Sequence, residues 1–144
     1  MICLSVKQPW ARLLFGSKNV ENRCWNWSPK RIETFRQTLP RRLLIHSSKT
    51  PDHDEESLAY ICEKWHPELE YRSLLHGEFA FYGAILGSVE LWDLMRVVTS
   101  TWHEEGCLGL YVRDPKLFAK PIPWKGQLGF FQVDEGAIDT RVDL

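Results

Sequence analysis

The residues that decide the fold of this chain form the stretch Gly16-Ser17-Lys18-Asn19-Val20-Glu21-Asn22-Arg23. It follows a short apolar segment and concentrates cations, a carboxylate and amides within a few positions. In a strand, period-two alternation sends Glu21 and Arg23 to the same face, and Lys18 then lies at the beginning of the strand beside them. Such a cluster suits an anionic or amide-bearing ligand. The alternative is a solvated strand edge that carries a surface ion pair.

Working outward from this stretch, residue alternation and turn signals predict strands and helices without a regular βαβ rhythm. A short helix should start at Pro9 and end at Gly16, and an acidic helix should run from Asp52 to Pro67. Ser28–Arg42 is predicted to be a cation-rich connector. A strand is expected at each of Ile2–Gln8, Val20–Trp27, Leu43–Ser47, Leu108–Val112 and Gly129–Val133, with one long strand or a strand pair at Phe79–Leu94.

These elements favour an α+β barrel over a doubly wound sheet. Turns at Asp114-Pro115 and at Pro121/Pro123 are expected to separate the last two strands. With 144 residues, 44% of them apolar, the chain is long enough for one domain, residues 1–144, with a real core. No apolar run approaches the ~20 residues of a membrane span.

Four sequence elements carry a family resemblance. Gly16, Lys18, Glu21 and Arg23 match the pattern Gly-x-Lys-x-x-Glu-x-Arg, and the runs Leu4–Ala11, Leu43–Lys49 and Pro121–Phe131 occur around it in a matching order. In this the chain resembles the ASCH domain family, a branch of the PUA-like superfamily, over roughly Ile2 to Val133. The resemblance implies a PUA-like mixed β-barrel flanked by two or three helices. Its ligand cleft would lie beside the first helix and the second strand.

The resemblance also implies what this cleft holds, a nucleotide or a stretch of RNA, with Lys18, Glu21 and Arg23 lining it. From the chain itself we add three groups of candidate binding residues. One rim is formed by Lys7, Gln8 and Trp10; the floor or opposite wall by His46, Ser47 and Lys49; and a phosphate contact by Arg41 and Arg42.

Each of these additions has a plainer explanation beside the functional one. The side chain of Trp10, like those of Trp25 and Trp27, either stacks on a base or packs in the core. His46 is either catalytic or a hydrogen-bonded core histidine. Arg41 and Arg42 either contact phosphate or are solvated surface.

Two functions are therefore predicted for the cleft. The first is a binding module for RNA or a nucleotide in RNA metabolism, in which Lys18 and Arg23 hold phosphate or a base edge and Glu21 accepts from an exocyclic amine. The second is a small hydrolase, either a ribonuclease or an amidohydrolase that acts on N4-acetylcytidine-like nucleosides. A protein-interaction module with a vestigial cleft is a third possibility.

For the hydrolase, the resemblance implies a Lys, Thr and Glu set, and Lys18 matches its lysine. Glu21 occupies the position of the threonine nucleophile, which leaves Ser47, Thr99 or an activated water to act instead. Glu104 or Glu105 is the nearest counterpart of the glutamate. The tentative catalytic residues are thus Lys18, Glu21 and Glu104, and a His103/Glu104 pair is an acid–base alternative for RNA cleavage.

Charge and cysteine usage indicate which partners and which cellular compartment suit this chain. Residues 1–50 hold ten Lys and Arg against two acids, whereas residues 51–144 hold eight against seventeen, so the two halves differ strongly in sign. Either this asymmetry produces a basic face for phosphates, or the halves interleave and the charges mix. The scattered Cys3, Cys24, Cys62 and Cys107 suit a reducing cytoplasm and do not match a metal-site spacing. We expect a cytoplasmic monomer without metal or cofactor.

Overall fold

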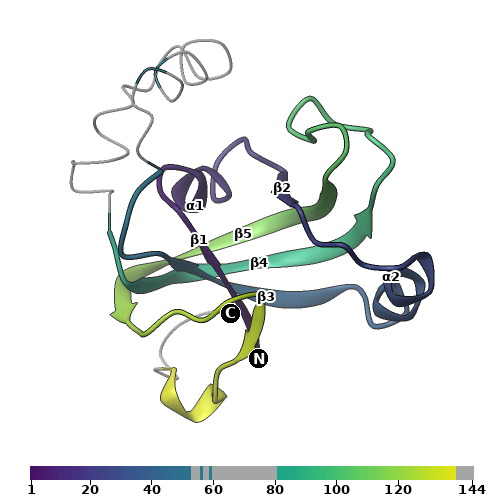
Figure 1. Cartoon of the computed structure of the whole chain (residues 1–144). Helices are drawn as coiled ribbons and strands as arrows, with labels where there is room; N and C mark the ends of the chain where they lie inside the picture. The colour runs from purple at the N-terminus through teal and green to yellow at the C-terminus, as the bar shows by residue number, and fades with distance from the viewer. Residues whose placement is uncertain (53–55, 57–58, 60–80, 139–144) are drawn as a thin grey trace.

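The central feature of the computed structural model, which describes residues 1–52, 56, 59 and 81–138, is one mixed sheet that curls into a half-barrel (Figure 1). The helices are α1 (Trp10–Leu13), α2 (Pro29–Arg36) and the short 3-10 helix η1 (Glu135–Ala137). The strands are β1 (Ile2–Val6), β2 (Val20–Arg23), β3 (Arg41–Ser47), β4 (Ala84–Met95), β5 (Leu108–Pro123) and β6 (Phe130–Gln132).

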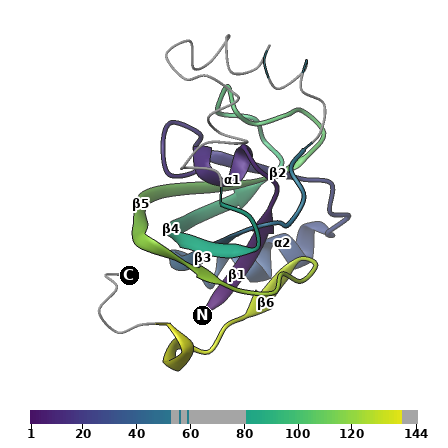
Figure 2. The same cartoon turned by 90° about the vertical axis from the view of Figure 1, so that its left-hand side faces the viewer.

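The strand order is β2-β5-β4-β3-β1-β6, so β1 lies between β3 and β6 although it comes first in the chain. The β1–β3 pair is parallel and the other pairs are antiparallel. Ile2 is opposite Leu43 on one side and Gln132 on the other. Strands β2 and β6 form the two edges of the sheet. Figure 2 shows β5 bending round the sheet and β6 beside β1.

The core occupies both faces of the central strands, which explains their nearly continuous apolar sequences. In β3, Leu43 and Ile45 belong to one buried cluster and Leu44 belongs to the other. The same alternation holds in β1, where Leu4 faces the first cluster and Cys3 the second. Helix α1 packs against β1 and β3, and α2 packs against β4.

The α+β class and the barrel-like sheet are confirmed, and every predicted strand has a counterpart. Several details were wrong. The strand that begins at Val20 ends at Arg23 and not at Trp27. The connector Ser28–Arg42 contains α2, whose first turn is capped because the Ser28 side chain accepts from the backbone N–H of Arg31 at 3.1 Å. Strand β3 starts at Arg41, which places Arg41 and Arg42 in the sheet.

Strand β5 also differs from the expectation, because it continues through the two predicted turns for 16 residues. Asp114 adopts a left-handed conformation with φ of 49° within it, and β5 stays paired to β4 on both sides of that point through register shifts. The predicted acidic helix Asp52–Pro67 lies largely outside the described residues. Within the described part of the chain, no helix is both long and apolar enough to cross a membrane.

Candidate functional site

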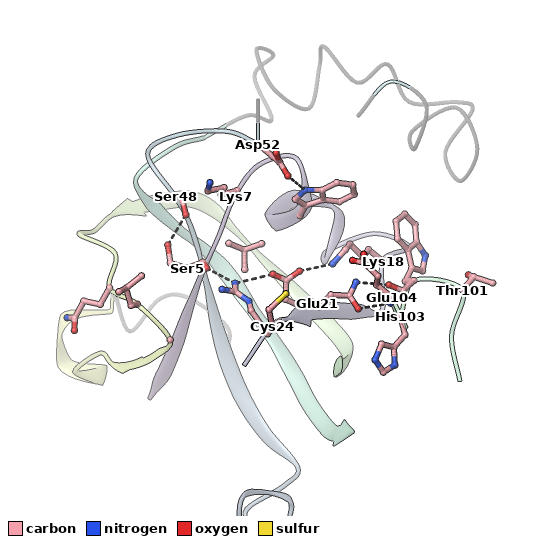
Figure 3. Close-up of a pocket in the computed structure, with 18 residues that line it drawn as sticks. Ser5, Lys7, Lys18, Glu21, Cys24, Ser48, Asp52, Thr101, His103 and Glu104 are labelled. Atoms are coloured by element: carbon pink, nitrogen blue, oxygen red, sulfur yellow. Dashed lines mark hydrogen bonds and ion pairs between the residues drawn. The ribbon is translucent and has the colours of Figure 1, made fainter. Parts of the chain in front are cut away.

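A cavity of about 740 Å³ lies between β1, the α1–β2 region and two loops that come from distant parts of the sequence (Figure 3). Strand β1 lines it with Ser5 and Val6, the following residue Lys7 adds to this side, and β2 contributes Glu21, Asn22 and Arg23. The loop before β5 supplies residues 101–104, and the segment before β6 supplies residues 127–129. Its size lies within the range of pockets for small ligands, about 300–1,000 Å³.

Lys18, Glu21 and Arg23, all from the stretch Gly16 to Arg23 (the decisive stretch), form an ion-paired triad in this cavity. The dashed lines in Figure 3 show the pair of Lys18 and Glu21. The ammonium group of Lys18 donates to Oε1 of Glu21 at 2.8 Å and to the carbonyl oxygen of Val20 at 2.6 Å. A guanidinium nitrogen of Arg23 lies 3.0 Å from Oε2 of Glu21. Two members of the triad are buried and one is partly buried: the Lys18 and Glu21 side chains are 4% and 11% exposed, and that of Arg23 is 22% exposed.

The charge state of Glu21 follows from this geometry. Burial acts to raise the pKa of the carboxyl, but the charges of Lys18 and Arg23 and their hydrogen bonds outweigh it, so the pKa lies below its ordinary value. Glu21 is therefore ionised at neutral pH. It acts as an acceptor that holds both cations in fixed positions.

Arg23 has a hydrogen-bond donor that the described part of the protein does not use. Its Nη2 donates to the backbone oxygen of Ser5 at 2.7 Å, which ties β2 to β1. Its Nε is buried and has no hydrogen-bond partner among the described residues. A buried unsatisfied donor costs about 1–3 kcal/mol, so a water or a ligand acceptor is needed to complete this position.

One rim of the cavity is formed by Lys7 and Trp10, as expected, together with Asp52. Trp10 is half-buried, and its indole N–H donates to a carboxylate oxygen of Asp52 at 3.1 Å. It both packs against the core and lines the cavity, and its ring centroid is 5.9 Å from the Lys18 ammonium. Lys7 is exposed at the same rim.

The opposite wall is held in place by Asn22, whose side-chain amide bridges β2 and the loop before β5. Its Nδ2 donates to the carbonyl oxygen of Trp102 at 2.9 Å, and its Oδ1 accepts from the backbone N–H of Glu104 at 2.8 Å. These two bonds bring Glu104 into the cavity lining. The wall is thus built by a residue that lies inside the decisive stretch but was not among the predicted site residues.

His103 lines the cavity, but both of its ring nitrogens are already used. Nε2 donates to the carbonyl oxygen of Cys107 at 2.9 Å, because a carbonyl oxygen only accepts, and Nδ1 is bonded to the Tyr111 hydroxyl at 2.6 Å. The ring also lies against Gly109, where an added Cβ would come within 2.7 Å of it. The bonds fix this side chain as part of the wall, so the His103/Glu104 acid–base pair has no free nitrogen to work with.

Three predicted residues lie outside the cavity lining and make structural hydrogen bonds. Gln8 is fully buried, donates to the carbonyl oxygen of Phe81 and accepts from the backbone N–H of Arg12. Ser47 donates to the carbonyl oxygen of Ala84 at 3.2 Å. His46 is buried between the Ser5 hydroxyl and the carbonyl oxygen of Trp124.

The remaining predicted residues are also placed away from the cavity. Lys49 is exposed beside Gly83, and Thr99 and Glu105 do not line the cavity. Arg42 donates to the Ser88 hydroxyl and pairs with Asp114 at 3.1 Å, and its neighbour Arg41 is half-buried.

The charges of the two halves of the sequence mix in the fold. Arg36 pairs with Asp93 at 2.9 Å and Arg42 pairs with Asp114, so cations of the basic half meet acids of the acidic half. Lys30 and Arg31 form no ion pair within the described residues. The ion pairs of Arg36 and Arg42 support the alternative in which the two halves interleave and their charges mix.

Sequence reasoning missed the cavity residues that distant segments contribute. Among the parts of the cavity lining that were not predicted are Cys24, Ser48, Thr101 and residues 127–129. Cys24 comes directly after Arg23 in the sequence. The other three are brought to the cavity only by the pairing of the strands. Gly16 has no steric need to be glycine, since an added Cβ would lie 3.6 Å from the nearest atom beyond its chain neighbours, the carbonyl oxygen of Leu13. Among the described residues, no group of three or more His, Cys, Asp or Glu side chains is arranged to hold a metal ion.

Comparison with known proteins adds no relative: no protein-family model matches the chain, and a search of curated proteins found no match. The arguments about function that follow therefore rest on the residues and geometry described above.

Proposed function

We propose that this chain is an ASCH domain of PUA-like fold that binds a nucleotide, or one unpaired nucleotide of an RNA, in the cavity of the triad. The observation that carries the proposal is the largely buried Lys18–Glu21–Arg23 triad on the cavity wall. Buried ion pairs are weak sources of stability, because desolvation offsets much of their attraction. Charged groups that are kept in a cleft at this cost are good candidates for a binding site.

The free hydrogen-bonding capacity of the triad matches the edge of a nucleobase. The Lys18 ammonium uses two of its protons inside the protein, which leaves one for a ligand acceptor. The Nε of Arg23 lacks a partner within the described residues. The Glu21 carboxylate has lone pairs left to accept from an exocyclic amine. Trp10 and Trp102, on either side, offer apolar surface to a planar ring.

The charge balance of the cavity favours a base or nucleoside over a polyphosphate. Its cationic side chains are matched in number by its carboxylates: Lys7, Lys18 and Arg23 against Glu21, Asp52 and Glu104. A cluster of phosphates would be repelled by those acids. A base presents donors and acceptors on the same edge, which suits a lining of mixed sign.

A hydrolase is the second candidate function, and one specific contact favours it. The Ser5 hydroxyl lines the cavity and lies 2.9 Å from Nδ1 of His46, whose Nε2 donates to the Trp124 carbonyl oxygen. Burial lowers the pKa of His46, so the ring is neutral at pH 7 and Nδ1 is free to accept the serine proton. This pairing of a hydroxyl with a base is the arrangement of an activated nucleophile, and Lys18 and Glu104 line the same cavity.

The test is an equilibrium titration of labelled single-stranded RNA against wild type and the Lys18→Ala/Arg23→Ala double variant, with the products run on a gel. Affinity lost in the variant, with the RNA intact, supports the binding module. Cleaved RNA, or release of acetate from N4-acetylcytidine, supports the hydrolase, which Ser5→Ala should then abolish.

Because loss of the triad also weakens the fold, Cys24→Trp provides a second variant. Cys24 is exposed and lines the cavity, so the larger ring blocks the site and leaves the triad intact. Arg113→Ala, at an exposed site away from the cavity, is the control. Unchanged RNA affinity in both cavity variants would overturn the proposal. The proposal includes a location in the reducing cytoplasm. The free thiols of Cys3, Cys24 and Cys107 support that location.

A further inference from the structure

A second hollow, of about 1,000 Å³, adjoins the triad cavity and has a different character. Residues 25–28, 30, 31, 34, 35 and 38 of the β2–α2 segment line it, together with the residues just before and within β6. Leu128 and Gly129 line both hollows, so the two meet at this point of the chain. Leu128 is fully exposed there and makes an apolar ridge between them.

Two stacked aromatic rings with a cation at each end connect the two hollows. The rings of Trp25 and Trp27 are stacked, with centroids 5.3 Å apart and planes 15° from parallel. The Arg31 guanidinium lies over the Trp27 ring at 4.1 Å, and the guanidinium of Arg23 lies over the Trp25 ring at 5.7 Å. The contacts therefore run from Arg23, a member of the triad, to Arg31 in the second hollow.

This array is held firmly by the aromatic residues beneath it. Phe130 of β6 meets the Trp25 ring edge-on at 5.1 Å, and Phe35 of α2 meets the Trp27 ring edge-on at 5.4 Å. Phe35 and Phe130 are themselves stacked, at 5.2 Å. Both tryptophans remain half-buried, so part of each indole faces the hollow.

The charge of the second hollow is of one sign. Lys30 and Arg31 line it and are exposed, and none of the described residues in its lining is Asp or Glu. Neither cation has a carboxylate partner in the described part of the chain. The triad cavity next to it is balanced in charge. A ligand that spans both would thus present a base to the first and phosphates to the second.

We propose that the two hollows form one track for single-stranded RNA, an inference that rests on the nucleotide-binding function proposed above. One base enters the triad cavity, and the strand crosses Gly129 to place its next phosphates against Lys30 and Arg31. Neighbouring bases contact the exposed edges of the Trp25 and Trp27 indoles, whose faces are covered by each other and by Arg23 and Arg31. A duplex does not fit this arrangement, because its bases are stacked on one another and its readable edges are restricted.

The experiment compares two probes, a mononucleotide and a labelled hexanucleotide of mixed sequence, on wild type and on the Lys30→Ala/Arg31→Ala variant. Both side chains are exposed on α2, so the variant should keep its fold. We expect hexanucleotide affinity to fall about tenfold and its salt slope to decrease by about 1.4, which is the value for two phosphate contacts on a single strand. Mononucleotide affinity should not change. Trp27→Leu should also weaken only the hexanucleotide.

Arg113→Ala is the matched control, because Arg113 likewise lies over a tryptophan ring, at 5.3 Å from Trp92, on another part of the surface. It should leave both probes unaffected. The track would be overturned if the Lys30→Ala/Arg31→Ala variant bound the hexanucleotide with the affinity and salt slope of wild type, even if the mononucleotide still binds through Lys18. Equal competition by an acidic peptide or by duplex RNA would also overturn it. A wild type that binds the hexanucleotide through Lys30 and Arg31 but does not bind the mononucleotide would overturn the proposed function of the triad cavity, and with it the part of the track that places a base there.

Discussion

Replacing the charges of the triad one at a time and then together measures how strongly Lys18 and Glu21 depend on each other. Lys18→Met and Glu21→Gln remove one charge each with little change in shape. The side chains are 4% and 11% exposed and their atoms lie 2.8 Å apart, so each single variant leaves a buried charge with fewer partners. Removing one partner of a buried pair costs about 3–5 kcal/mol, and Arg23 remains nearby, so we expect about 3 kcal/mol for each.

The double variant should cost clearly less than the sum of the two single variants. With both charges gone, no uncompensated charge is left at either position, and coupling energies between contacting residues are about 0.5–3 kcal/mol. We expect a value in the upper half of that range, because the Lys18–Glu21 contact is almost completely desolvated.

Urea unfolding followed by tryptophan fluorescence at neutral pH gives these free energies. With a typical slope of about 1–3 kcal/mol/M, a loss of 3 kcal/mol lowers the unfolding midpoint by about 1–3 M, and the slope itself should not change. Single variants that cost less than about 1 kcal/mol, the range of exposed ion pairs, would refute the reasoning. Strict additivity in the double variant would refute it as well.

Three further predictions concern acid stability, close backbone packing and the loop wall. The pKa of Glu21 is lower in the folded than in the unfolded chain. The ionised carboxylate therefore contributes fully to the free energy of unfolding above the unfolded pKa of about 4.3, and this contribution is lost as the pH falls toward the folded pKa. The difference in unfolding free energy between wild type and Glu21→Gln should therefore shrink on acidification, and a constant difference would contradict this. Gly87→Ala should lower the free energy of unfolding, measured by heat or urea, by about 1–3 kcal/mol, because the added Cβ would meet the backbone of β5. Gly16→Ala, where the added Cβ has room, should leave it nearly unchanged. Equal losses in the two variants would disprove the steric argument. Tyr111→Phe leaves His103 without its hydroxyl partner and should cost about 1–3 kcal/mol, and an unchanged unfolding midpoint would count against the role given to that bond.

Local patterns in the sequence were enough to predict the strands but not α2. In β1 and β3 almost every side chain is buried on one face or the other, so apolar runs mark them clearly. Helix α2 has no fully buried residue and only two apolar positions packed against the core, Ile32 and Phe35, so its apolar stripe was short and its cations resembled those of a solvated connector. The signal that was present is Ser28 followed by Pro29, a capping residue and a favoured first helical residue.

The triad could be predicted because its members are close in sequence, and the rest of the cavity could not. Lys18, Glu21 and Arg23 are placed by the period of a single strand and the turn before it. The opposite wall depends on the Asn22 side chain reaching Trp102 and Glu104, about eighty positions away. An asparagine in a strand carries no sign of which distant loop it will bind. His103 is the opposite case. Its position next to Glu104 suggested acid–base catalysis, and only the fold reveals that Cys107 and Tyr111 already bind both ring nitrogens.

The position of β1 between β3 and β6 has a consequence for the time at which the protein can fold during synthesis. Among the described strands, β1 is synthesised first, whereas its antiparallel neighbour β6 is synthesised last. Until Phe130–Gln132 emerge, the apolar β1 has an open edge and Phe131 cannot cover Cys3. Such long-range pairing slows folding, because the loop must close before any contact repays it. Strand β1 can pair with β3 earlier, but its other edge stays open until β6 is made, and an open edge of a hydrophobic strand is the situation in which chaperones protect against aggregation.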